Sequence, residues 1–233
     1  MNIIDAVSVA IVILFVLLGV YKGFLNTLLS IGAYVISALL AFLFKPLAAA
    51  GVKGSASLYS MMLYYTEGSE FISNPEYVRA EISSLSTAEI NDVISSSNLP
   101  YPMGREVAKN IAREAFADQG VVTLGDYFNQ TIVGVFINIL VFLLLFALIR
   151  LLLSLVINGA DYADPFPMLR RHDALLGGAL GLIRGMLALL LLFMLVPIAL
   201  TVLSQFDLII SMVDESAAAR VFYRLNLLIS LAA

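Results

Sequence analysis

The chain has 233 residues, of which 61% are hydrophobic and only 13% are charged. Together with a mean hydropathy of +0.98, this composition excludes an ordinary soluble globular protein and indicates an integral membrane protein. The formal net charge of −4 argues against a nucleic-acid partner, because a basic patch is the usual footprint of nucleic-acid binding.

Four apolar runs are long enough to cross a membrane, because a helix needs roughly 20 residues to cross about 30 Å of hydrocarbon. The first run carries Asp5 near its start and lacks the cationic stretch of a secretory signal peptide, so we expect it to be retained. Only Tyr21-Lys22-Gly23 separates the first two runs, which predicts a tight helical hairpin. The four predicted spans cover residues 3–20, 24–44, 131–149 and 185–204.

These spans define the predicted fold: an all-α, polytopic membrane protein with four transmembrane helices and an extracytoplasmic helical insertion. Residues 1–44 form the first transmembrane hairpin, and residues 129–204 form the second, with a cytoplasmic loop over about 150–184. Residues 45–128 form the extracytoplasmic cap, and residues 205–233 form a C-terminal tail.

Cations near the helix ends predict the orientation, because short cytoplasmic loops carry an excess of lysine and arginine. An N-terminus outside the cytoplasm places five such cations on the cytoplasmic side: Lys22, Arg150, Arg170, Arg171 and Arg184. Both chain ends and residues 45–128 are then extracytoplasmic.

The segment 45–128 has the signals of an ordinary aqueous helical region. Asn74-Pro75-Glu76 predicts a helix start, and Ser86-Thr87-Ala88-Glu89 predicts a second one. A turn is expected over residues 95–102, and a third helix over Met103–Asp118 with Gly120 beyond its end. Its apolar stripe, which we expect to be a packing face, contains Val107, Ile111, Ala115 and Phe116.

The tail follows Pro197, which is expected to kink the fourth span. Residues 219–229 are amphipathic but too short to cross a membrane. One hypothesis places them at the membrane interface, with Arg220 and Arg224 among the lipid headgroups. The alternative is that the tail packs back onto the extracytoplasmic cap.

A glycine ladder marks the start of the fourth span. Gly177, Gly181 and Gly185 follow one another at four-residue spacing, so they share one helix face on which another helix backbone can approach closely. Residues 19–25 and 181–187 share the pattern glycine, two residues, cation, glycine, apolar residue, leucine, so Gly19 and Gly23 are also candidate packing residues. Either each hairpin is one copy of a two-helix unit, or the match is chance in a chain rich in glycine and leucine.

These residues also carry a resemblance to a known family. Asp5 at the head of the first helix, the Lys22-Gly23-Phe24 turn, and Asp173 followed by the glycine ladder resemble the CvpA family of colicin V production proteins. The resemblance covers residues 1–45 and 150–205. It implies a multi-pass protein of the bacterial plasma (inner) membrane, linked to toxin production or export and to envelope integrity. The long segment 45–128 differs from the short connection of typical members.

Charged residues inside or beside the spans are candidate functional residues, because charge is costly within a bilayer. Lys22, Arg150, Asp173 and Arg184 each lie close to a predicted cytoplasmic boundary. The cations either anchor the helices and contact lipid phosphates, or belong to a solute path. Asp161, Asp164 and Asp173 are expected to pair with nearby arginines.

The sequence offers no set of residues typical of catalysis. The chain contains no cysteine and only one histidine, His172, which we interpret as a solvated loop residue. This excludes disulfides, a cysteine nucleophile and the usual transition-metal clusters. Gly-x-Ser-x-Gly and Walker motifs are also absent. We therefore expect a non-enzymatic protein without catalytic, cofactor or metal residues.

Two functions remain. The first is a scaffold or interaction protein whose glycine faces assemble the helix bundle or a homo-oligomer, while the cap contacts an envelope protein. The second is an oligomeric channel or transporter for an unknown solute or ion. Both have the lipid bilayer as a partner, and neither involves nucleic acid.

Overall fold

The computed structural model describes residues 2–159, 172–204 and 206–233. These residues are almost entirely helical, and the described part of the chain contains no strand beyond an isolated bridge between Glu81 and Thr123. The chain divides into two compact units. Unit 1 comprises Met1–Lys45, Phe142–Val196 and Phe206–Leu228; unit 2 comprises Pro46–Val141, Pro197–Gln205 and Ile229–Ala233.

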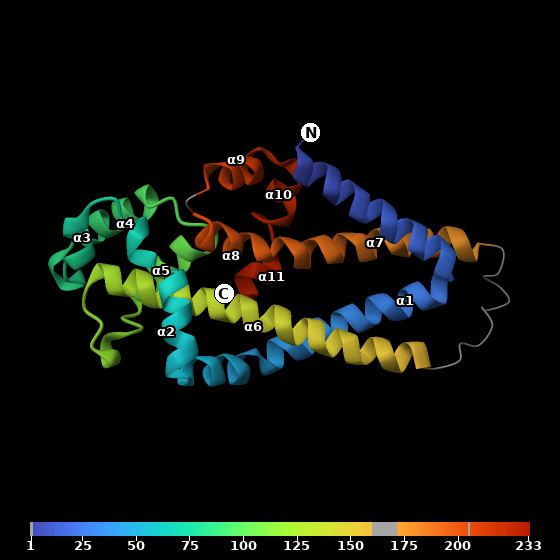
Figure 1. The fold of residues 1–233 in the computed structure, drawn as a ribbon, viewed down its shortest axis with the longest axis horizontal. Helices are drawn as coiled ribbons and strands as arrows, with labels where there is room; N and C mark the ends of the chain where they lie inside the picture. The colour runs from blue at the N-terminus through green and yellow to red at the C-terminus, as the bar shows by residue number, and fades with distance from the viewer. Residues whose placement is uncertain (1, 160–171, 205) are drawn as a thin grey trace. The chain divides into compact units, whose positions relative to one another are not determined.

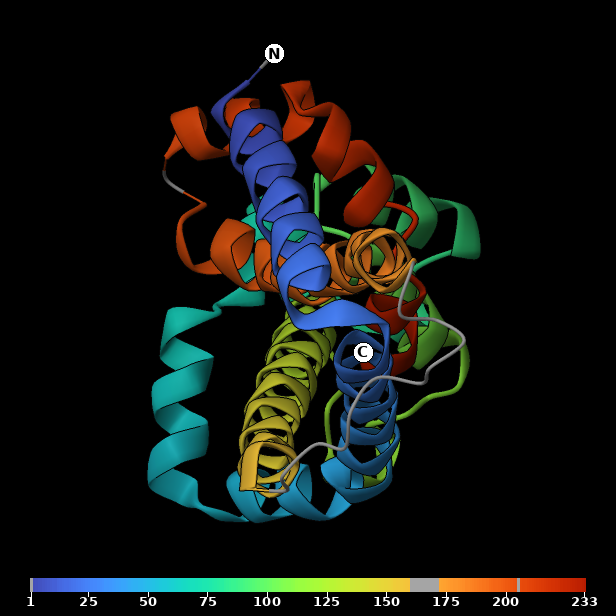
Figure 2. The same cartoon turned by 90° about the vertical axis from the view of Figure 1, so that its right-hand side faces the viewer.

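Helix α1 (Ile3–Gly54) is interrupted at Gly23, which has the non-helical torsion angles φ 76° and ψ 178°. This positive φ favours glycine, because a side chain would be strained there. The two arms of α1 run in different directions on either side of the break (Figures 1 and 2). The predicted turn at residues 21–23 is therefore present, and the second arm extends ten residues beyond its predicted end at residue 44.

Three helices in the described part of the chain are long and apolar enough to cross a membrane: Ile3–Gly54, Leu124–Val156 and Asp173–Val202. The second belongs to α6 (Leu124–Gly159), and the third comprises α7 (Asp173–Phe193) and α8 (Leu195–Val202). Helix α7 ends at Phe193, four residues before Pro197, whose ring clashes with the carbonyl group of residue 193 in a continuous helix. The kink that the sequence predicts at Pro197 is therefore present as an interruption of the helix at Met194.

Unit 2 contains the short helices of the insertion. They are α2 (Ala56–Tyr65), η1 (Gly68–Phe71), α3 (Pro75–Arg79), η2 (Ile82–Ser84), α4 (Thr87–Ser96), α5 (Met103–Ala112) and η3 (Ala117–Gln119). Of these, the sequence predicts α3, α4 and α5. The Asn74 side chain accepts a hydrogen bond from the Glu76 backbone N–H, as its predicted capping role requires. Val107 and Ile111 of α5 are buried, in agreement with the predicted stripe. The other half of the stripe is wrong, because Ala115 is exposed and both Ala115 and Phe116 lie beyond the end of α5.

The predicted helix Met103–Asp118 is too long, because α5 ends at Ala112. Glu114 adopts a left-handed φ of 49°, and the backbone N–H groups of Glu114 and Ala115 donate to the carbonyls of Ile111 and Asn110. This is the Schellman pattern that closes a helix, which usually has glycine at the left-handed position. Without glycine at residue 114, the sequence did not indicate this end.

The residues after α8 form α9 (Asp207–Glu215), α10 (Ala217–Phe222) and α11 (Leu227–Ala232). Within unit 1, α10 packs against α7, with the rings of Phe222 and Phe193 6.0 Å apart. Residues 229–233 instead belong to unit 2, where Ser230 hydrogen-bonds to Tyr101 of the insertion. This contact agrees with the alternative that the tail packs back onto the insertion, and the interfacial hypothesis for residues 219–229 stays a prediction.

The start of α4 provides a first testable prediction. The Ser86 hydroxyl accepts from the Glu89 backbone N–H, and the Glu89 carboxylate accepts from the Ser86 hydroxyl and backbone N–H. These hydrogen bonds lower the pKa of Glu89 below its ordinary value of 4.5. We expect Ser86→Ala to destabilise the protein by about 1 kcal/mol at neutral pH.

The pH dependence follows from the direction of the shift. A carboxyl group with a lowered pKa stabilises the folded state above its ordinary pKa, and this contribution is lost as the pH falls through the lower value in the folded state. The difference in melting temperature between wild type and Ser86→Ala should therefore narrow as the pH falls below about 4.5. A difference that stays constant from pH 7 to pH 3 would contradict the role of Glu89.

Candidate functional site

The glycine ladder of α7 lies against the first arm of α1 within unit 1. A methyl group placed on Gly181 would lie 3.0 Å from the Cα of Val16, and one placed on Gly185 would lie 3.2 Å from the Cα of Val12. A methyl group on Gly19 would lie 2.9 Å from the carbonyl carbon of Gly177. The two helices therefore approach backbone to backbone, as the sequence predicts for glycine faces.

Two further glycines belong to this contact. Gly178, which the four-residue spacing did not select, faces Val20, since an added methyl group would lie 2.8 Å from its Cγ2. Gly23 lies at the end of the contact, where an added methyl group would lie 2.9 Å from the Cγ of Asp173. The structure thus brings all five predicted packing glycines to the contact between α7 and the first arm of α1.

Asp173 joins the start of α7 to the break in α1. Its Oδ1 accepts a hydrogen bond of 2.9 Å from the backbone N–H of Phe24, the first residue of the second arm. The break leaves the first N–H groups of this arm without helical partners, and a carboxylate is favourable beside the positive end of a helix dipole. Asp173 therefore caps a helix 149 residues away in sequence. Lys22, directly before the break, is exposed.

The other two predicted charges, Arg150 of α6 and Arg184 of α7, both lie beside Tyr34 in the second arm of α1. The guanidinium carbon lies 4.9 Å from the centre of the Tyr34 ring for Arg150 and 5.8 Å for Arg184. Arg184 also lies 5.0 Å from the centre of the Phe15 ring. Both arginines therefore make cation–π contacts, and they share one ring.

Within the part of the chain that the structure describes, neither arginine has the acidic partner that the sequence predicts. Among the described residues, no carboxylate forms an ion pair with Arg150 or Arg184. Asp173 is occupied by the Phe24 backbone. The remaining members of the predicted charge cluster lie outside the described residues: Asp161, Asp164, Arg170 and Arg171.

Asp5, a residue of the family pattern, has a role that sequence reasoning missed. Its Oδ1 accepts hydrogen bonds from the Ser216 hydroxyl at 2.7 Å and from the Ala218 backbone N–H at 2.9 Å. Ser216 is the N-cap residue of α10. Asp5 thereby fixes the start of α10 to the first turn of α1, a contact between residues more than 200 positions apart.

Unit 2 contains a polar cavity of about 310 Å³ that the sequence did not indicate. Three cationic side chains, those of Lys53, Lys109 and Arg113, lie on its wall with a single acidic side chain, that of Glu106. The cavity is therefore electropositive, and its volume suits a small molecule with an anionic group. Its other polar wall residues are Asn110, Gln130, Thr131 and Asn138.

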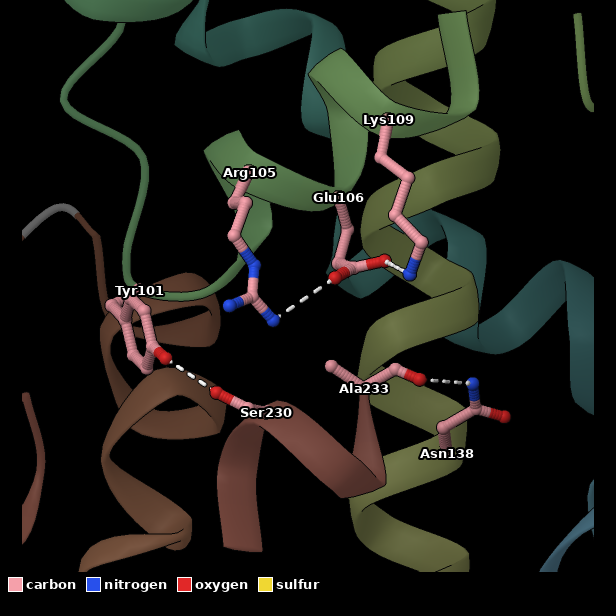
Figure 3. Close-up of polar contacts among 7 residues, drawn as sticks. All are labelled: Tyr101, Arg105, Glu106, Lys109, Asn138, Ser230 and Ala233. Atoms are coloured by element: carbon pink, nitrogen blue, oxygen red, sulfur yellow. Dashed lines mark hydrogen bonds and ion pairs between the residues drawn. The ribbon is translucent and has the colours of Figure 1, made fainter. Parts of the chain in front are cut away.

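Hydrogen bonds hold the walls of this cavity together (Figure 3). Glu106 is 5% exposed and accepts from Lys109 at 2.6 Å and from Arg105 at 3.3 Å. The Asn138 amide donates to the Ala233 carbonyl at 3.2 Å. Tyr101 and Ser230 share a hydrogen bond of 2.6 Å, so α11 is tied to residues of the insertion and of α6.

The Glu106 cluster gives a second prediction. Glu106→Gln removes the negative charge that two exposed cations share while keeping the size of the side chain. We expect a loss of about 1–3 kcal/mol in the free energy of unfolding, measured by thermal unfolding in detergent. The exposed Glu67→Gln is a matched control with no expected effect. Equal melting temperatures for the two variants would show that the Glu106 charge does not hold this wall.

The comparison with protein families tests the resemblance that the sequence indicates. Residues 4–80 match the colicin V production protein family. This confirms the resemblance over the region that contains Asp5, the Lys22-Gly23-Phe24 turn and α1 from Ile4 onward. The match continues to residue 80, beyond the predicted limit of residue 45, and does not include the predicted second region, residues 150–205. No curated protein and no solved structure matches the chain.

Together, the colicin V production family match and the three apolar helices identify a membrane protein. The described residues contain no group of three or more histidine, aspartate or glutamate side chains placed to hold a metal ion. The positions of the glycines, Asp173 and the two arginines come from the structure, and their roles stay predictions.

Proposed function

We propose that the protein is a non-enzymatic scaffold or interaction protein of the bacterial inner membrane, acting in colicin V production or export and in envelope integrity. The family match over residues 4–80 supports the link to colicin V production. The observation that carries the proposal is the backbone-to-backbone contact of α7 with the first arm of α1. Such a contact favours a fixed helix pair over a water-filled path between the two helices.

The proposed topology has four spans, with both arms of α1 crossing the membrane. The break at Gly23 supports this count, since the first arm of Ile3–Gly54 then contains about the 20 residues that one crossing needs. Lys22, directly before the break, assigns the break to the cytoplasmic side in this topology. Residues 45–128 and both chain ends are then extracytoplasmic, as the placement of cations predicts.

Single cysteines test this topology, because the chain has none of its own. Ser84→Cys and Leu169→Cys are labelled in intact cells with a membrane-impermeant thiol reagent. Labelling at residue 84 and not at residue 169 is expected. The reverse pattern would contradict the proposed orientation, and labelling of both after permeabilisation controls for access.

A channel or transporter is the second candidate function. It is favoured by Arg150 and Arg184, two charges on candidate membrane helices with unsatisfied hydrogen-bond donors. Flux measurements on liposomes that contain the purified protein distinguish the two functions. A channel predicts ion or solute flux that changes with Arg184→Ala, whereas the scaffold predicts no protein-dependent flux.

A further inference from the structure

Two guanidinium groups meet at one aromatic ring in unit 1. Arg150 of α6 and Arg184 of α7 lie 4.9 Å and 5.8 Å from the centre of the Tyr34 ring. Like charges repel, and a single aromatic ring compensates two cations less well than one. The arrangement therefore leaves positive charge uncompensated among the described residues.

The hydrogen bonds of these arginines are also incomplete. Arg150 Nη1 and Arg184 Nε are buried and have no acceptor in the described part of the chain. A guanidinium carries five N–H donors and no acceptor, so only an electron-rich partner satisfies it. Aromatic faces attract the charge of the group but do not replace oxygen acceptors in its plane. The two unsatisfied atoms belong to the two arginines that share the Tyr34 ring.

The position of the pair along the helices makes this deficit costly. Tyr34 and Arg184 each lie 11 residues beyond their helix starts at Gly23 and Asp173, which corresponds to about 16 Å. The contact between Asp173 and Phe24 places those two starts at the same level. The pair therefore lies about half a hydrocarbon thickness from that end of the helices, where water does not readily solvate the charge.

We infer that Arg150 and Arg184 form a binding site for an oxyanion, that is, a phosphate or carboxylate group, beside Tyr34. Such a group supplies both missing features: negative charge between two cations, and oxygen acceptors in the planes of the guanidinium groups. The group belongs either to a small solute or to a lipid headgroup. The site is compatible with a scaffold and with a transporter, so the inference does not rest on either function.

Thermal unfolding tests the inference on the purified full chain in neutral detergent. Sodium phosphate is compared with sodium chloride at matched ionic strength. We expect phosphate to raise the melting temperature of the wild type by a few degrees, and the rise to saturate, because a ligand that binds the folded state stabilises it. The rise should be absent in Arg150→Gln and in Arg184→Gln. The control Arg224→Gln, which removes an exposed ion pair with Asp214, should respond as the wild type does.

Native mass spectrometry after exchange into phosphatidylglycerol identifies the source of the anion. A bound lipid that is lost in both variants assigns the site to a headgroup, and a phosphate response without bound lipid assigns it to a solute. The absence of both in the folded wild type would overturn the inference. So would equal responses of the wild type and both Gln variants.

The stability of the variants in anion-free buffer separates a binding site from simple packing. Removal of one of two like charges should leave the melting temperature unchanged or higher. A structural stack predicts a lower melting temperature and no anion dependence, which would also overturn the inference. If the Gln variants do not fold, Arg184→Lys keeps the charge but removes the Nε donor. It should need at least several-fold more phosphate for the same rise, and an unchanged requirement would contradict the site.

Discussion

Gly181→Leu is expected to prevent the close approach of α7 to α1 and to cause the largest loss of stability of any single substitution considered. A leucine side chain at this position would collide with the backbone of Phe15 and Val16, which cannot move aside as a flexible side chain would. Overpacking of this kind costs about 1–3 kcal/mol, and more where the obstacle is backbone. We expect a much lower yield of folded protein and a lower melting temperature in detergent.

The matched control is Gly32→Leu, the same substitution in the second arm of α1. No atom lies within 4 Å of a methyl group placed on Gly32, so the leucine enters open space. The melting temperature of this variant should stay close to that of the wild type. Equal melting temperatures for Gly181→Leu and Gly32→Leu would contradict the backbone-to-backbone contact.

Asp173→Ala should give the second large effect, because it removes the acceptor of the Phe24 N–H at the break in α1. An unsatisfied buried donor costs about 1–3 kcal/mol. The carboxylate also lies at the positive end of the second arm, so its loss removes a favourable charge–dipole interaction. We expect a lower melting temperature in detergent.

Two further variants separate these contributions. Asp173→Asn keeps an oxygen acceptor but loses the charge, so its melting temperature should lie between those of the wild type and Asp173→Ala. Asp118→Ala changes an exposed aspartate outside this contact and should have no effect. If Asp173→Ala is as stable as Asp118→Ala, the cap does not hold the break together.

Local features of the fold could be predicted from the sequence because their causes lie within a few residues. The break at Gly23 follows from a three-residue connection between two apolar runs. The caps at Asn74 and Ser86 follow from residue types at fixed spacing. The close helix contact of α7 could be predicted because glycine occurs at every fourth position. The identity of its partner, the first arm of α1, could not be predicted from this spacing.

Features that depend on distant parts of the chain could not be predicted in this way. The sequence indicates Asp173 as a residue of the family pattern but gives no sign of its partner, because it becomes a cap only when the fold brings it to Phe24. Arg184 was placed at a membrane boundary because the fourth span was expected to begin at residue 185. Helix α7 begins at Asp173, so Arg184 lies about three turns inside it and reaches Tyr34. No periodicity marks the convergence of three helices on one ring.

The central claim is that the first arm of α1 packs against the glycine face of α7, and a double-cysteine cross-link tests it most directly. A methyl group placed on Gly185 would lie 3.3 Å from the Cβ of Phe15, close to the separation of about 3.5–4.5 Å between the Cβ atoms of a disulfide. In membranes under mild oxidation, Phe15→Cys with Gly185→Cys should form an intramolecular disulfide, detected as linked peptides by mass spectrometry. Phe15→Cys with Ile183→Cys, on an exposed face of α7, should not. Efficient cross-linking of residues 15 and 183, without cross-linking of residues 15 and 185, would contradict this helix packing.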